Sequence, residues 1–132
     1  MDFELLDQAI KIIETQPGTW RQWGWISRYV ENNGQEGWCG TAACVAGHIA
    51  LLAGWTPKWG DDIYRNETGM VQRDGEAIPV SYAAMRALGV DPEQSSANQI
   101  WLGRMFRGEN NLEAVKACRN VLATVNGVPL KP

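Results

Sequence analysis

The chain has 132 residues, of which 45% are hydrophobic and 20% are charged, and this composition excludes a wholly disordered or fibrous protein. A net charge of −3 argues against a protein that mainly neutralises the phosphates of nucleic acids. A chain of this length fits one domain, so we expect residues 1–132 to fold around a single hydrophobic core.

The first predicted element is an amphipathic helix that ends at Pro17-Gly18. Its apolar residues recur at helical spacing: Phe3, Leu6, Ile10 and Ile13. Residues 19–38 follow as a segment rich in tryptophan. Trp20, Trp23 and Trp25 cannot all face one side of a helix or a strand, so at least one of them is expected to be exposed or to pack beneath a loop.

The next predicted helix is the central one. Thr41 is a good N-cap for a helix that runs to Ala53, where Gly54 ends it. The sequence AACVAGHIALLA between them is apolar nearly all round, which is typical of a helix buried on most sides. We therefore predict that the rest of the chain packs around this helix.

Residues 55–78 read as a loop, apart from one short β-hairpin closed around Asp74-Gly75. A short helix is expected over residues 81–88, with Gly89 after it. Together with two helices near the C-terminus, these patterns predict a mainly α fold. It is one compact domain of about five helices around a buried central helix, with one short β-hairpin.

The two C-terminal helices are predicted from their caps. Asp91 and Pro92 are typical of a helix start and predict a helix that reaches Arg107, with Trp101 in the core. Asn110 is the predicted N-cap of the last helix. The expected inward stripe of that helix is Leu112, Val115, Cys118, Leu122 and Val125. A solvated basic face is expected from Arg104, Arg107, Lys116 and Arg119, offset by Glu109 and Glu113.

The stretch QEGWCGTAACVAGHIA holds two of the three cysteines and the only histidine of the chain. A cysteine nucleophile needs a nearby imidazole, but His48 lies nine residues after Cys39, which is about 13 Å along an intact helix. Cys44 and His48 are one turn apart and can touch, yet no carboxylate that would orient the imidazole accompanies them. The sequence therefore disfavours a catalytic cysteine.

A metal site is the next alternative, because Cys39, Cys44, His48 and Cys118 would supply the ligands of a structural zinc ion. The spacing contains no C-x-x-C pair, and Cys118 needs the last helix to dock at the same place. We therefore expect no metal and no cofactor, and the cysteines as small buried hydrophobes. A Cys39–Cys44 disulfide and an anion at a Gly40-Thr41 helix start are the remaining alternatives.

The tryptophans are the candidate recognition residues, since indole is a favoured anchor at protein interfaces. Trp55 and Trp59, just past the central helix, would form a cleft with the earlier tryptophans. The predicted binding residues are Trp20, Trp23, Trp25, Trp38, Gly40, Thr41, Trp55 and Trp59.

The expected compartment is the cytoplasm. No apolar run of about 18 residues is present, and the N-terminal sequence MDFELLDQAIKII has acidic residues where a signal peptide needs basic ones. An odd number of cysteines also suits a reducing compartment. We expect no membrane contact.

The order W…W…CGT-x-x-C-x-A-G-H, followed by LLAGW, ALGV and RMF, resembles a family of small uncharacterised proteins of actinobacterial bacteriophages and various bacteria. The matching residues are Cys39-Gly40-Thr41, Cys44, Ala46-Gly47, Leu52-Ala53-Gly54-Trp55, Leu88-Gly89 and Met105-Phe106. The family pattern often places tryptophan where His48 stands, which argues against a catalytic or ligand role for His48. The resemblance brings no activity with it, and it implies a phage protein that acts in the host bacterial cytoplasm.

We therefore expect a non-enzymatic phage accessory protein that binds a host bacterial protein, or counters a host defence, through the Trp-rich surface of residues 19–38 and 55–65. A second hypothesis is a protein that sequesters a nucleotide-like small molecule between the aromatic walls and Gly40-Thr41. A third is a hydrolase that uses Cys39 or Cys44.

Overall fold

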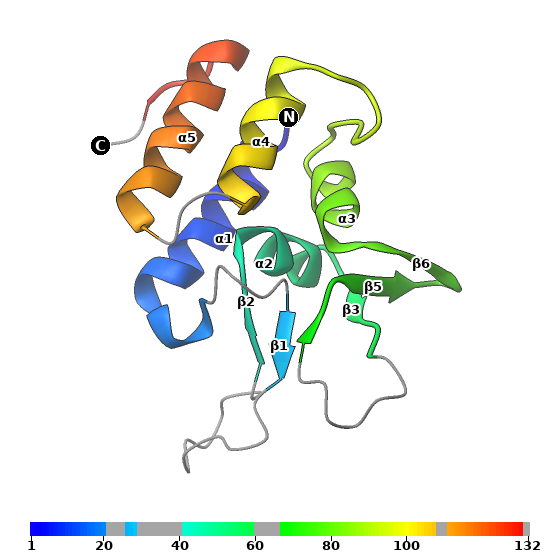
Figure 1. The fold of residues 1–132 in the computed structure, drawn as a ribbon. Coiled ribbons are helices and arrows are strands. Elements are labelled where there is room, and N and C mark those ends of the chain that lie inside the picture. Colours follow the sequence, from blue (N-terminus) through cyan, green and yellow to red (C-terminus); the bar gives the residue numbers. More distant parts are fainter. Residues whose placement is uncertain (21–25, 29–40, 60–66, 108–110, 131–132) are drawn as a thin grey trace.

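The computed structural model describes residues 1–20, 26–28, 41–59, 67–107 and 111–130 (Figure 1). This part of the chain forms five α-helices and two small antiparallel sheets, so the mainly α prediction is confirmed, although the fold is not purely helical. None of these helices is long and apolar enough to cross a membrane. The helices are α1 (Phe3–Thr15), α2 (Val45–Leu52), α3 (Val80–Ala87), α4 (Ala97–Arg107) and α5 (Leu112–Asn126), with a 3₁₀ turn η1 (Pro17–Thr19).

Helix α1 forms where the sequence predicts it. The Asp2 carboxylate is its N-cap and accepts a hydrogen bond from the Leu5 backbone N–H at 3.0 Å. Pro17 begins η1 directly after the helix. One face of α1 is buried in the core, through Leu6, Ala9, Ile10 and Ile13.

Helix α2 is buried as predicted, but its N-cap lies three residues after the predicted one. Thr41 lies in strand β2 (Thr41–Ala43), which pairs antiparallel with β1 (Ile26–Arg28). The N-cap is Cys44, whose sulfur accepts a hydrogen bond from the Gly47 N–H at 3.4 Å. The prediction failed because pairing with β1 occupies the backbone of residues 41–43, and sequence alone does not show that partner. Every residue from Val45 to Ala50 is buried, and α2 contacts α1, α3 and α4.

The predicted hairpin is confirmed. Strands β5 (Met70–Arg73) and β6 (Glu76–Pro79) pair across a two-residue turn in which both residues have positive φ, 52° at Asp74 and 82° at Gly75. Asp-Gly suits this turn because aspartate tolerates, and glycine readily adopts, that backbone conformation. Strand β3 (Thr56–Pro57) pairs with β5, and β4 (Glu67–Thr68) pairs with β1. These short strands were not predicted, because two or three residues carry no readable alternation.

The start of α4 differs from the prediction. Asp91 caps a local turn instead of the helix, since its carboxylate accepts from the Glu93 N–H at 2.9 Å. The hydroxyl of Ser96 accepts from the Gln99 N–H at 3.1 Å, and the helix begins at the following residue. Aspartate followed by proline therefore marks a turn here, six residues before the helix.

The N-cap of the last helix also differs from the predicted one. Asn111, not Asn110, is the N-cap, and its side chain accepts from the Glu113 N–H at 2.8 Å. Within the predicted inward stripe Val115 and Leu122 are buried, but Val125 is 48% exposed. Arg119, expected on a solvated face, is instead only 4% exposed.

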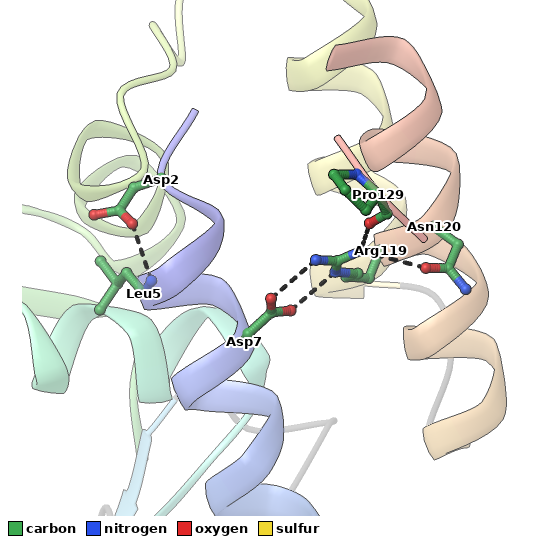
Figure 2. Close-up of polar contacts among 6 residues, drawn as sticks. All are labelled: Asp2, Leu5, Asp7, Arg119, Asn120 and Pro129. Carbon is green, nitrogen blue, oxygen red and sulfur yellow. Dashed lines mark hydrogen bonds and ion pairs between the residues drawn. The ribbon is translucent and has the colours of Figure 1, made fainter. Parts of the chain in front are cut away.

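Arg119 is buried because it joins three segments of the chain (Figure 2). Its Nε and Nη2 donate to the two carboxylate oxygens of Asp7 on α1, both at 2.9 Å. Its Nη1 donates to the Pro129 carbonyl at 2.9 Å, and the guanidinium lies 5.1 Å from the centre of the Phe3 ring. Such a two-bond contact between arginine and carboxylate is among the stronger polar contacts in proteins. It ties α1, α5 and the C-terminal tail together.

Candidate functional site

The predicted tryptophan surface is only partly within the described residues. Trp23, Trp25, Trp38 and Gly40 lie outside them. Trp55 is 4% exposed, with the Arg73 guanidinium 4.4 Å from the centre of its ring, so it presents no open indole face to a partner. Trp20 and Trp59 are partly buried and pack against the core. Trp55 is therefore closed to a partner, while recognition through Trp20 and Trp59 stays a prediction.

The anion site predicted at Gly40-Thr41 depended on a helix start at that point. Because Thr41 belongs to β2, its backbone pairs with Arg28 and is not the first turn of a helix. The positive end of a helix dipole is therefore absent from Thr41, and the prediction is wrong in this respect.

Cys44 and His48 do lie together, one turn apart on α2. The Nδ1 atom of His48 is 3.0 Å from the Cys44 carbonyl oxygen, so this ring nitrogen contacts the main chain. Burial raises the pKa of the Cys44 thiol to about 11, with a smaller opposing effect from the Gly47 N–H. The thiol is therefore protonated at neutral pH, which disfavours Cys44 as a nucleophile.

The alternative zinc ligands are not gathered among the described residues. Cys39 lies outside them, and Cys118 is partly buried on α5 beside a groove. Across residues 1–20, 26–28, 41–59, 67–107 and 111–130, no group of three or more His, Cys, Asp or Glu side chains could hold a metal ion.

A groove of about 680 Å³ lies between α3, α4 and α5. We call this space the α4 groove, because α4 lies between α3 and α5 in Figure 1. Small side chains leave this space open: a Cβ added at Gly103 would meet no atom within 4 Å, and Ala114 and Ala117 line the opposite wall. The lining also includes Tyr82, Ile100, Trp101 and Arg104.

Helix α4 supplies the apolar rim of this groove. Ile100 is 52% exposed, more than the other large hydrophobic side chains described except Leu130. Trp101, predicted to be core, is only partly buried and packs against the core with the groove beside it. Exposed isoleucine next to a partly buried indole is the composition of a contact surface, where apolar anchors are removed from water by a partner.

Among the described residues that line the α4 groove, Arg104 carries the one charge. The guanidinium of Arg104 lies 4.8 Å from the centre of the Trp101 ring, which is one helical turn away. Among the described residues it forms no ion pair, since the three ion pairs there join Arg86 to Glu76, Lys116 to Glu14 and Arg119 to Asp7. From the sequence, Arg104 is predicted only to lie on a solvated basic face. The signal that could have identified it is its spacing of three residues from Trp101.

A second cavity, of about 310 Å³, lies between α1 and α5, and most of its charged side chains form ion pairs with one another. Its walls include Asp7 and Arg119, which pair with each other. Lys116 pairs with Glu14 at 2.8 Å, and this contact lowers the pKa of Glu14 and raises that of Lys116. Four of the five charged side chains that line this cavity pair with one another and join the two helices, so we take the α4 groove as the better candidate site.

Comparison with protein-family models, curated proteins and solved structures gave no match to this chain.

Proposed function

We propose that the protein is a non-enzymatic bacteriophage accessory protein that binds a host bacterial protein, and that the α4 groove is its contact surface. The observation that supports this most is Ile100, which is 52% exposed on the rim of the groove next to Trp101. Because Ile100 lines the groove and is still 52% exposed, a protein segment lying across the groove would remove more of this side chain from water than a small ligand would. This favours a protein partner over the nucleotide-like ligand. The phage and host setting rests on the sequence resemblance.

The side chains that line the α4 groove favour a binding function over a catalytic one. Its polar side chains include hydroxyls of Ser81 and Tyr82, an amide of Gln99 and the Arg104 guanidinium. The hydroxyls and the amide donate and accept hydrogen bonds and the guanidinium donates them, but the lining residues that the structure describes include no carboxylate or imidazole to move a proton at neutral pH. We therefore assign the contact surface, within the described residues, to the α4 groove and not to the Trp-rich segment.

Affinity capture from host lysate with two matched variants tests this function. Ile100→Ser is expected to weaken capture of the partner by on the order of tenfold, because it removes an apolar anchor from the contact. Leu52→Ser is the control, since Leu52 is similarly exposed, at 41%, but lies on α2 away from the groove. Equal capture by wild type, Ile100→Ser and Leu52→Ser would overturn the proposed function.

A further inference from the structure

Arg104 differs from the other arginines whose contacts the structure gives. Arg86 and Arg119 donate to carboxylates, and Arg73 donates to the Ala53 carbonyl at 2.8 Å. For Arg104 the contact within the described part of the chain is the Trp101 ring. Its side chain is exposed, so the guanidinium N–H groups can donate hydrogen bonds to water without a desolvation penalty.

The stacked position has a chemical consequence. A guanidinium against an indole keeps its plane, while its N–H groups point outward around the edge. A carboxylate can then take two parallel hydrogen bonds from that edge, and little side-chain freedom is lost because Trp101 already limits the movement of Arg104. The arrangement suits an incoming acidic group whose neighbour is apolar.

The surroundings of Arg104 favour the same ligand. Among the described residues that line the groove, Ile100 and Trp101 lie beside Arg104, and none is acidic. Tyr82 adds a hydroxyl from α3, partly exposed on the opposite wall. A single positive charge in an otherwise uncharged lining selects a partner with one complementary negative charge, because an unpaired basic group there would be penalised.

We infer that the α4 groove recognises a host-protein segment in which an aspartate or glutamate stands beside an apolar anchor, with Arg104 binding the carboxylate and Ile100 and Trp101 contacting the anchor. This inference rests on the proposed function and adds to it the chemistry of the partner. Arg104 sets the specificity of the contact, and the apolar rim provides most of its area.

Selection from a displayed library of random peptides tests the inference without knowledge of the partner. Peptides that bind the wild-type protein are expected to be enriched in Asp or Glu next to Leu, Phe or Trp, and to lose binding to Ile100→Ser. With Arg104→Gln, the same peptides are expected to bind about tenfold more weakly, and reselection should yield apolar peptides without the acidic preference. Arg86→Gln is the matched control, because Arg86 is exposed but already paired with Glu76. It should leave binding unchanged.

The outcomes separate the inference from the proposed function. Peptides that depend on Ile100 but show no acidic preference, or that bind Arg104→Gln as well as wild type, would overturn the inference and leave the groove as a contact surface. Peptides insensitive to Ile100→Ser, or no enrichment at all, would overturn both. Saturable binding of indole-3-acetate, without any enriched peptide, would identify the occupant as a small aromatic acid and would also overturn both.

Discussion

Replacing Asp7 by alanine is expected to lower the free energy of unfolding by about 3–5 kcal/mol. The Asp7 side chain is 20% exposed and that of Arg119 is 5% exposed, so the variant leaves a buried guanidinium without its counter-charge. The Pro129 carbonyl and the Phe3 ring remain, but neither carries a negative charge. Urea denaturation followed by circular dichroism measures the change.

The control for this prediction is the neighbouring ion pair on the same two helices. Glu14 and Lys116 are 48% and 34% exposed, so Glu14→Ala should produce no measurable change in stability. The double variant Asp7→Leu with Arg119→Met should recover much of the loss of Asp7→Ala, because it removes both charges. If Asp7→Ala proves as harmless as Glu14→Ala, the buried ion pair does not hold α1 to α5.

The second large effect is expected from Ile49→Ala, at about 2–5 kcal/mol of destabilisation. Ile49 is completely buried on α2, which contacts three other helices, so truncation leaves a cavity that several rigid elements surround. Leu52→Ala is the matched control on the same helix. Because Leu52 is 41% exposed, its truncation should change stability by no more than about 0.5 kcal/mol. Similar losses in both variants would show that α2 is not the centre of the core.

The parts of the fold that could be predicted from sequence are those determined by neighbouring residues. Helix α1 has an apolar stripe and a terminating Pro17, and the β-hairpin has Asp74-Gly75. In each case the signal lies within a few residues, so no distant segment was needed to read it. The burial of α2 was also readable, because a helix without a polar face must be covered by others.

The errors in predicting the fold come from residues that suit two different local structures. Thr41 and Asp91 both suit an N-cap, but Thr41 pairs with a distant strand and Asp91 closes a local turn. Arg119 looked like a solvated charge because its partner, Asp7, lies 112 residues away in the chain. Tertiary partners decided each case, and sequence periodicity contains no information about them.

The candidate site could not be predicted for a related reason. The α4 groove exists because three helices dock around Gly103 and two alanines, and no single segment shows that space. The sequence does show Trp101 and Arg104 three residues apart on one helix, but Trp101 was assigned to the core. In the structure Met105 is buried while Ile100 is exposed.

Photo-crosslinking in host cells tests the central claim, that the α4 groove is the contact surface for a host protein. A photoreactive phenylalanine analogue at position 100 is expected to give one main covalent product with a host protein, and the same analogue at position 52 should not give that product. The Arg104→Gln background should reduce the yield from position 100. A product formed equally well from positions 52 and 100, or from position 52 alone, would contradict the claim.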